Sequence, residues 1–432
     1  MEKIHLLPRN TPLVGEIHVP GDKSITHRAI ILGSLAKGIT KVTNFLNAED
    51  CWRTIQTFQS LGITIEQQHS TLTIRGKGKC ALKEPSIPLY FGNSGTTARL
   101  LLGILSGLPF FTTMYGDSSL NNRPMQRIVQ PLKQMGACID GRSHSQHLPL
   151  AVRGGKLRGI HYTLPVNSAQ VKSAILLAGL FAEGTTTVIE KVETRNHTEN
   201  MLRTFGADIT VERHGCIKIS NKKDLEARHI DIPGDISSAA YFIAAAAIFP
   251  GSNLIIKNVG LNETRTGILD VLKQMGASIM IRDKKCMNGE CFGNINVKYS
   301  NLKGTIIEGN IVPRLIDEIP IIALIATQAE GSTIIRDASE LRVKETDRIK
   351  AIVNMLLNLG ANIKETDDGM IIYGKTSLTG GYVQSYADHR IAMTAAIASF
   401  VADEDIVIDD ISAVDVSYPG FFQTLYQIAP TA

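Results

Sequence analysis

The stretch IHVPGDKS, residues 17–24, decides the fold, because it recurs as IDIPGDIS at residues 230–237. The two stretches match at six of eight positions when the Val19/Ile232 pair is counted as a match. The glycines of the two stretches lie 234 − 21 = 213 residues apart in a chain of 432. A segment that recurs half a chain away predicts two similar halves, joined where the two Pro-Gly-Asp segments occur.

A shorter repeat subdivides each half. Five segments share an apolar helical stripe, a glycine and an alternating run: TFQSLGITIE (57–66), PLKQMGACID (131–140), MLRTFGADIT (201–210), VLKQMGASIM (271–280) and MLLNLGANIK (355–364). The stripe predicts a helix with one face on a core. The glycine ends that helix in the left-handed region, and the alternation after it predicts a half-buried strand. Successive turn glycines are spaced by 74, 70, 70 and 84 residues.

The repeat predicts a mixed α/β fold made of βαβαββ units, because both apolar periods alternate along it. A sixth copy is truncated: in FFQTLYQIA, residues 421–429, an alanine stands where the turn glycine belongs. We expect the other chain end, where EIHV (16–19) follows a glycine, to supply the missing strands. The predicted architecture is two domains of three units each: residues 21–231 form one, and residues 1–20 and 232–432 form the other.

Composition excludes several classes of protein. The chain is 44% hydrophobic and 20% charged, which is typical of soluble globular proteins. It has no uninterrupted apolar run long enough to span a membrane and no signal peptide at its start, so we expect a cytoplasmic protein. The net charge of 45 − 41 = +4 is too small to predict binding to nucleic acid.

The six cysteines do not form a disulfide pattern for a chain of this length. Cys286 and Cys291 make an isolated C-x4-C with no second pair, so a zinc site is not expected. We expect ordinary thiols in a reducing compartment. Residues 286–294 account for the longer fourth spacing, and we interpret them as a surface excursion.

Four predicted helix starts in the first domain combine cations with capping residues. A helix N-terminus presents N–H groups and the positive end of the helix dipole, and a nearby Lys or Arg adds counter-charge for an anion. The stretches are GDKSITHR (21–28), with Lys23, Ser24 and Arg28; GNSGTTARL (92–100), with Gly95 and Arg99; NNRPMQR (121–127), with Arg123 before a proline at the first helical position; and VNSAQVK (166–172), with Gln170 and Lys172. The candidate caps are Asp22 or Ser24, Asn93 or Ser94, and Asn167 or Ser168.

The second domain instead mixes carboxylates with cations near helix starts. The stretches are PRLIDEIP (313–320), with Asp317 and Glu318; ELRVKETDRI (340–349), with Lys344, Glu345 and Arg348; and YADHRIAM (386–393), with Asp388 and Arg390. Each alone is more typical of a cap or of a solvated, ion-paired helix face. Because repeated units place equivalent helix ends on one face, we expect these groups to converge on a cleft for a substrate with several negative charges.

Other catalytic templates are missing from the sequence. It contains no G-x-x-x-x-G-K-[ST] for nucleoside triphosphates and no G-x-G-x-x-G after a strand. The H-E-x-x-H and G-x-S-x-G motifs are also absent. The supply of lysine and arginine therefore points to a phosphorylated small molecule that is handled without a metal or another cofactor.

Seven motifs in order, GDKSITHR, GNSGTTAR, NNRPMQR, NSAQVKS, RLIDEIP, RVKETDR and ADHR, resemble the 5-enolpyruvylshikimate-3-phosphate synthase family, the 3-phosphoshikimate 1-carboxyvinyltransferases. The resemblance covers essentially the whole chain. It implies two domains, each of three βαβαββ units, that close over the substrates. It also implies transfer of the carboxyvinyl group of phosphoenolpyruvate to the 5-hydroxyl of shikimate 3-phosphate, with release of phosphate. We expect a monomer, because a single chain contains a complete site.

The resemblance also implies the site residues. For shikimate 3-phosphate they are Lys23, Ser24, Arg28, Ser168, Ala169, Gln170, Asp317 and Lys344. For phosphoenolpyruvate they are Lys23, Gly95, Arg123, Gln170, Arg348 and Arg390. Asp317 would be the base toward the 5-hydroxyl, Glu345 the acid that protonates the methylene carbon, and Lys23 the cation that stabilises the tetrahedral intermediate.

Two positions depart from the pattern of many family members. Ala169 stands where a second serine is common, and Val416 stands where a lysine often precedes the aromatic-Pro pair. Together with TRNHTE (194–199), these changes resemble a more divergent subgroup of the family. In that subgroup we expect Arg195 to be an added ligand of the phosphate.

Three other functions compete with this one. The sister enzyme that acts on UDP-N-acetylglucosamine typically has a reactive cysteine in its mobile loop, and residues 114–127 contain none. An RNA-terminal phosphate cyclase would need a broad basic face, which a charge of +4 does not favour. A non-catalytic phosphate-binding module would not need Lys23, Asp317 and Glu345 together.

Overall fold

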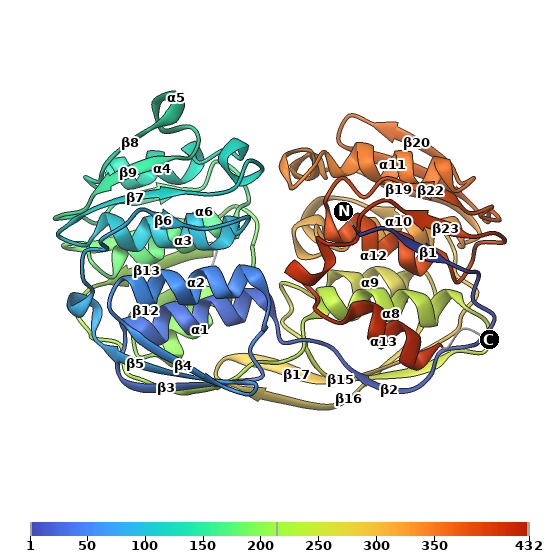
Figure 1. The fold of residues 1–432 in the computed structure, drawn as a ribbon, viewed down its shortest axis with the longest axis horizontal. Helices are drawn as coiled ribbons and strands as arrows, with labels where there is room; N and C mark the ends of the chain where they lie inside the picture. Colours follow the sequence, from blue (N-terminus) through green and yellow to red (C-terminus); the bar gives the residue numbers. More distant parts are fainter. Residues whose placement is uncertain (1, 213–214, 430–432) are drawn as a thin grey trace. The chain divides into compact units, whose positions relative to one another are not determined.

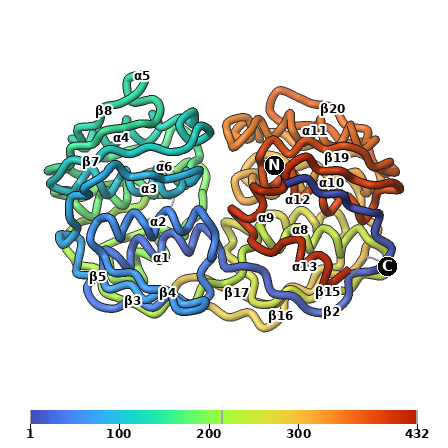
Figure 2. The backbone as a smooth tube through the Cα atoms, viewed as in Figure 1, coloured from blue at the N-terminus to red at the C-terminus, as the bar shows by residue number. Residues whose placement is uncertain are grey.

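The computed structural model describes residues 2–212 and 215–429, and the chain divides into two compact units (Figures 1 and 2). Unit 2 comprises Gly21–Ile232 and Met287–Glu290. Unit 1 comprises Met1–Pro20, Pro233–Cys286 and Cys291–Ala432, so it is built from both chain ends.

Within its described residues, unit 2 contains three βαβαββ repeats. The first is β14 (His229–Asp231), α1 (Lys23–Leu35), β3 (Lys37–Thr43), α2 (Glu49–Ser60), β4 (Thr64–Gln68) and β5 (Thr71–Lys77). The second is β6 (Leu89–Tyr90), α3 (Gly95–Ser106), β7 (Phe111–Tyr115), α4 (Gln126–Gln134), β8 (Cys138–Gly141) and β9 (Leu150–Arg153). The third is β10 (His161–Thr163), α6 (Ala169–Gly179), β11 (Thr185–Ile189), α7 (His197–Thr204), β12 (Asp208–Glu212) and β13 (Cys216–Ser220).

Unit 1 continues the same order of elements. The fourth repeat is β2 (Val14–His18), α8 (Ile236–Ile248), β15 (Asn253–Gly260), α9 (Gly267–Gln274), β16 (Ser278–Met287) and β17 (Glu290–Lys298). The fifth is β18 (Ile306–Ile307), α10 (Ile319–Thr327), β19 (Gly331–Ile335), α11 (Arg348–Asn358), β20 (Asn362–Thr366) and β21 (Gly369–Gly374). The sixth is β22 (Gly381–Val383), α12 (His389–Ala398), β23 (Ile406–Ile408) and α13 (Phe421–Ile428), with β1 (Ile4–Leu6).

The first five repeats each fold their strands into one small four-stranded sheet with the same order, and the sixth forms a three-stranded sheet, β1-β23-β22. In the second repeat the order is β6-β7-β9-β8, with β6 parallel to β7 and β9 antiparallel to both β7 and β8. The predicted turn glycines have φ between +84° and +100°, the left-handed region that a helix-ending glycine adopts at little cost. These glycines are Gly62, Gly136, Gly206, Gly276 and Gly360.

The chain ends complete unit 1 differently from our expectation. The sixth repeat receives β1, whose Ile4 lies opposite Ile408 of β23 in an antiparallel pair. The prediction that residues 16–19 would complete this repeat is wrong, because β2 pairs in parallel with β15 of the fourth repeat. The strand before the other Pro-Gly-Asp segment, β14, pairs likewise with β3 of the first repeat. Each of these two strands therefore completes a sheet whose other strands are distant in the sequence but belong to the same unit.

The segment between β16 and β17 corrects two expectations. The strands form a hairpin whose turn residues, Asn288 and Gly289, have φ of 54° and 77°, as an Asn-Gly hairpin turn requires. Cys286 and Cys291 face each other across this turn and form a disulfide, so the expectation of thiols throughout is wrong for this pair. The segment is not wholly a surface excursion either, because Glu290 is buried and accepts a hydrogen bond from His197 Nδ1 at 2.8 Å.

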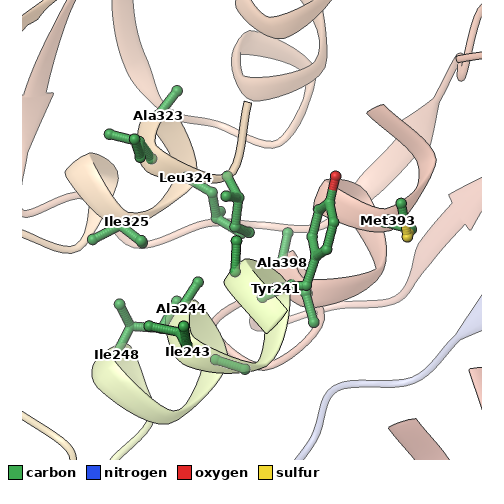
Figure 3. Packing of buried hydrophobic residues seen from close by; sticks show 14 of the residues in the cluster. Tyr241, Ile243, Ala244, Ile248, Ala323, Leu324, Ile325, Met393 and Ala398 are labelled. Atoms are coloured by element: carbon green, nitrogen blue, oxygen red, sulfur yellow. The ribbon is translucent and has the colours of Figure 1, made fainter. Parts of the chain in front are cut away.

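Three apolar helices form the centre of each unit. In unit 1 they are α8, α10 and α12, which contact one another, and every residue of α8 is buried. Figure 3 shows Tyr241 and Ala244 of α8 in this cluster with Leu324 of α10 and Met393 of α12. In unit 2 the centre is α1, α3 and α6. There, Gly103 lets α3 approach α6 closely, since a Cβ at this position would lie 2.2 Å from the Ala174 carbonyl oxygen.

Candidate active site

The first cation site lies at the start of α1. Asp22 caps the helix by accepting a hydrogen bond from the Ile25 N–H at 2.8 Å, so the cap is Asp22 and not Ser24. The Lys23 ammonium lies 3.2 Å from Oδ2 of Asp50, which is in the first turn of α2. This arrangement leaves Lys23 partly exposed, with 19% of its side chain accessible.

Arg28 is buried one turn further along α1 and is fixed at all three guanidinium nitrogens. Its Nε donates to Thr198 Oγ1 at 2.6 Å, its Nη2 to Ser173 Oγ at 2.9 Å and its Nη1 to the Ser24 carbonyl at 2.9 Å. Burial lowers the pKa of Arg28 to about 10, and the Glu199 carboxylate opposes that shift. Arg28 therefore stays charged at neutral pH and joins the starts of α1 and α7 to α6.

The second site lies at the start of α3. Ser94 is the cap, because its Oγ accepts from the Thr97 N–H at 3.3 Å. Arg123 lies in the turn that precedes α4. It donates from Nη2 to Asn93 Oδ1 and, at 3.2 Å, to Ser119 Oγ. A Cβ built on Gly95 would lie 3.3 Å from Nη1 of Arg99 and 3.4 Å from Nη1 of Arg123, so a side chain at this position would press on both guanidinium groups.

One detail of that stretch differs from the expectation. Helix α4 begins at Gln126 after the N-cap Met125. Pro124 therefore precedes the helix and does not occupy its first position. Arg123 still projects from the turn before the helix, as expected, and is buried with 9% exposure.

The third site lies at the start of α6. Ser168 is the cap, with its Oγ accepting from the Val171 N–H at 3.5 Å, and Ala169 begins the helix. Gln170 Oε1 accepts from Arg99 Nη1 at 2.6 Å, and its Nε2 donates to Thr96 Oγ1 at 3.2 Å. These two bonds join the start of α6 to α3. Because Arg28 joins α1 to α6, the predicted helix starts of α1, α3 and α6 are connected.

The two remaining predicted cations of unit 2, Arg195 and Lys172, differ in burial. Arg195 lies half-buried immediately before the N-cap residue of α7. Lys172 does not join the other cations, and the expectation that it would do so is wrong. Its side chain is fully buried, and its ammonium lies 3.0 Å from Glu190 Oε1 and 2.6 Å from Glu199 Oε1.

The centre of the unit 1 site is Asp317, just before α10. Its carboxylate lies 3.4 Å from Arg348 Nη1, 3.6 Å from Lys344 Nζ and 3.8 Å from Arg390 Nη2. Arg390 also donates from Nη1 to the Asp317 carbonyl at 3.0 Å. One carboxylate is therefore surrounded by three cations, two of which lie at the starts of α11 and α12.

Arg348 is held by two further carboxylates. Its Nε donates to Asp388 Oδ2 at 2.7 Å, and its Nη2 contacts Glu345 Oε2. Burial alone lowers the pKa of Arg348, but Asp388 and Glu345 more than reverse that effect, and the net shift is upward. The same Asp388 caps α12 by accepting from the Arg390 N–H at 2.9 Å. Although stretch 340–349 is typical of a solvated face, Arg348 is only 1% exposed.

The two candidate acid–base groups have different surroundings, as acid–base chemistry with two carboxylates requires. The side chain of Asp317 is 12% exposed and lies near three cations. That of Glu345 is 26% exposed, and Arg348 pairs with it. The partners of the cations were not predicted as such: they are Asp50, Asn93, Thr198 and Asp388. Asn93, Thr198 and Asp388 lie within the quoted stretches GNSGTTARL, TRNHTE and YADHRIAM, whereas Asp50 lies outside all of them.

The described residues contain neither a cluster of metal ligands nor a helix suited to crossing a membrane. Within residues 2–212 and 215–429, no group of three or more His, Cys, Asp or Glu side chains is placed to hold a metal ion. In the same part of the chain, no helix combines the length and the apolar character needed to cross a membrane.

Known structures and sequences share this fold and these motifs. The enolpyruvyl transferase NikO from Streptomyces tendae superposes with a TM-score of 0.80 at 16% identity, over 99% of this chain and 97% of that one. The fold is therefore that of the enolpyruvyl transferases. EPSP synthase from Acinetobacter baumannii superposes with a TM-score of 0.90 at 43% identity, over 100% of this chain and 99% of that one.

The sequence comparisons define the family. The profile of EPSP synthase (3-phosphoshikimate 1-carboxyvinyltransferase) matches residues 8–425. A 3-phosphoshikimate 1-carboxyvinyltransferase from Oceanobacillus iheyensis is 55% identical over 428 residues, which are 99% of this chain and 100% of that protein. The enzyme of that name from Bacillus subtilis is 53% identical over 96% of this chain and 97% of its own length. The chain belongs to the EPSP synthase family.

Because the Arg348–Asp388 pair is buried, we predict that the substitution Asp388→Asn strongly lowers the thermal stability of the protein. Asp388→Asn keeps a capping side chain but removes the countercharge of a buried guanidinium, and breaking a buried pair costs about 3–5 kcal/mol. For a domain of this size that corresponds to a fall in Tm of about 6–20 °C, which differential scanning calorimetry measures.

Asp270→Asn is the matched control in the same unit. Asp270 pairs with Arg314 at 2.7 Å, but their side chains are 48% and 30% exposed. An exposed pair contributes about 0–1 kcal/mol, so this variant should melt within a few degrees of the parent protein. Equal losses in the two variants would contradict the special role given to Asp388.

Proposed function

We propose that this chain transfers the carboxyvinyl group of phosphoenolpyruvate to the 5-hydroxyl of shikimate 3-phosphate and releases phosphate. This is the 3-phosphoshikimate 1-carboxyvinyltransferase step of the shikimate pathway, which leads to chorismate and the aromatic amino acids. The observation that carries the proposal is the Asp317 carboxylate among Lys344, Arg348 and Arg390, in a chain of the EPSP synthase family. A general base beside cations suits an alcohol that must attack an anionic substrate.

Both substrates carry several negative charges, so charge compensation decides which residues bind them. For shikimate 3-phosphate we propose Lys23, Ser24, Arg28, Ser168, Ala169, Gln170, Arg195, Asp317 and Lys344. The support in unit 2 is the set of connected helix starts, in which backbone N–H groups and cations occur together. Ala169 lacks a hydroxyl, but its backbone N–H belongs to the first turn of α6 and can still donate to an anion.

For phosphoenolpyruvate we propose Lys23, Gly95, Arg123, Gln170, Arg348 and Arg390. The buried guanidinium groups of Arg348 and Arg390 suit a carboxylate, because a guanidinium binds it through two parallel hydrogen bonds. Arg123 beside Gly95, which has no side chain to press on the guanidinium, suits the phosphate group. Val416 contributes no cation at the position where many relatives have lysine, and we propose that these three arginines suffice.

The proposed reaction proceeds by addition and then elimination. Asp317 takes the proton of the 5-hydroxyl, and the hydroxyl oxygen attacks C2 of phosphoenolpyruvate. Glu345 gives a proton to C3, which becomes a methyl group. Lys23 stabilises the tetrahedral intermediate, which carries both substrates. Glu345 then takes back one methyl proton, the C2–O bond to the phosphate breaks, and phosphate leaves with the proton held by Asp317, which forms the vinyl ether. Atoms and charge balance without a metal or another cofactor.

The assignment implies a particular organisation of the enzyme. We propose that the two three-repeat domains, residues 21–231 and residues 1–20 with 232–432, act on the same pair of substrates. A single chain carries the acid, the base and the cations, so we propose a monomer that works in the cytoplasm and needs neither nucleic acid nor a membrane.

Phosphate release is the direct test of the proposed reaction. The purified protein is mixed with phosphoenolpyruvate and with shikimate 3-phosphate, with UDP-N-acetylglucosamine, or with neither. We expect release only with shikimate 3-phosphate, because the loop at residues 114–127 lacks the sister enzyme's cysteine. Release with UDP-N-acetylglucosamine would favour the sister activity, and no release in any mixture would favour a binding module.

Two substitutions separate chemistry from binding. Asp317→Asn removes the base and should lower kcat about 10²- to 10⁴-fold with a modest change in KM. Arg123→Ala removes charged hydrogen bonds to phosphoenolpyruvate and should raise its KM about 10- to 100-fold. Steady-state kinetics with both substrates varied measures both effects.

Arg75→Ala is the control for charge removal in the same unit, since Arg75 pairs with Glu66 on the surface and its side chain is 49% exposed. It should leave both constants within about twofold. Equal, small effects of Asp317→Asn and Arg123→Ala would show that these residues do not have the proposed roles.

A further inference from the structure

Lys172 is a charged residue that the proposed chemistry does not use, although it is completely buried. It lies on α6 between two carboxylates, Glu190 after β11 and Glu199 on α7, whose exposures are 5% and 2%. One lysine faces two glutamates in this cluster, and Glu199 also interacts electrostatically with the buried Arg28. Such a cluster is expensive to bury, and well-packed apolar side chains often give equal or greater stability in its place.

The first arm of the cluster fixes the residue directly before Arg195. Glu190 Oε2 accepts from the Thr194 N–H at 3.1 Å and from Thr194 Oγ1 at 2.8 Å. Lys172 Nζ donates to the Thr194 carbonyl at 3.3 Å. All the polar groups of Thr194 are therefore bonded to the cluster, and its backbone cannot rotate without breaking charged hydrogen bonds.

The second arm fixes the helix that follows Arg195. Glu199 binds Lys172 from the first turn of α7, and the neighbouring Thr198 hydroxyl contacts Ser173 Oγ at 2.6 Å. Ser173 follows Lys172 on α6, so two successive residues of α6 contact two successive residues of α7. The residue before Arg195 and the helix after it therefore both form polar contacts with α6.

The electrostatics agree with a role in orientation. Burial raises the pKa of the Glu190 carboxyl, and Lys172 and Thr194 act in the opposite direction. Glu190 therefore depends on these two partners to remain an acceptor. Removing its charge should release Thr194 without removing any group that contacts the substrates.

We propose that Lys172 and Glu190 are positioning residues that hold Arg195 in the orientation that binds the phosphate group of shikimate 3-phosphate. The inference rests on the proposed function, which makes Arg195 a ligand of that phosphate. An arginine on a fixed backbone loses less conformational freedom on binding than one on a mobile loop. The cluster therefore acts on the affinity for one substrate and leaves the chemical step to other residues.

Glu190→Gln is the primary test, because it keeps the shape of the side chain and removes its charge. We expect the Kd of shikimate 3-phosphate, measured by isothermal titration calorimetry, to rise about tenfold, within the range of couplings inside one hydrogen-bond network. The KM of phosphoenolpyruvate and kcat should change less than about twofold. The exposed Glu212, which pairs with Lys218, gives the control Glu212→Gln, which should leave all three constants unchanged.

Thr194→Val is a second variant that keeps every charge of the cluster. It removes one hydrogen bond to Glu190 and should raise the same Kd about threefold. If thermal melting shows that Glu190→Gln does not fold, the Kd of Thr194→Val for shikimate 3-phosphate becomes the test of the positioning role. A Kd within error of the parent value in Thr194→Val would then overturn the proposal.

A double-mutant cycle with Arg195→Ala separates positioning from general loss of structure. If Glu190 acts through Arg195, then Glu190→Gln should raise the Kd in the parent protein but not in the Arg195→Ala background. An equal rise in both backgrounds would mean that the effect is structural and would overturn the inference.

The same cycle distinguishes the inference from the proposed function. If Arg195→Ala weakens binding of shikimate 3-phosphate and Glu190→Gln does not, the ligand role of Arg195 stands and only the positioning role fails. If Arg195→Ala leaves the Kd unchanged, the ligand role assigned to Arg195 fails and the inference fails with it.

Discussion

Charge compensation among buried cations is the constraint on which the candidate site residues of each unit depend. Arg28, Lys172, Arg348 and Arg390 are all at least nine-tenths buried, and a buried cation is stable only with partners. Unit 2 provides hydroxyl and carbonyl groups for Arg28, whose hydrogen bonds go to Thr198, Ser173 and Ser24. Unit 1 provides carboxylates for Arg348. The first arrangement suits the binding of an anion, and the second suits acid–base chemistry beside one.

The sixfold repeat explains how such groups come together within each unit from distant parts of the chain. Each repeat contributes two helices, and a helix start that was modified in one copy has counterparts in the others. The Lys-Ser pair that begins α1 corresponds to Ile236 and Ser237 at the start of α8, which is entirely buried. One copy of the motif therefore carries its own lysine, whereas in its counterpart Asp235 and Ser237 accept hydrogen bonds from the buried Arg265.

Much of this could be predicted from the sequence, because the signals were local and periodic. The turn glycines and the paired Pro-Gly-Asp segments identified the repeats, and the helix starts identified most candidate residues. The failures concern pairing over long distances. Nothing near EIHV shows that β2 pairs with β15, or that Ile4 lies opposite Ile408. The stretch VNSAQVK likewise does not show that Glu190 and Glu199 meet Lys172, since their positions depend on how α7 packs.

A crystal structure with shikimate 3-phosphate and phosphoenolpyruvate, or an unreactive analogue of it, tests the central claim most directly. The account predicts that the shikimate phosphate lies within hydrogen-bond distance of Lys23 and Arg195, with the 5-hydroxyl beside Asp317. It also predicts the phosphoenolpyruvate carboxylate against Arg348 and Arg390. Ligands bound elsewhere, with these arginines still contacting only Asp317, Glu345 and Asp388, would contradict the account.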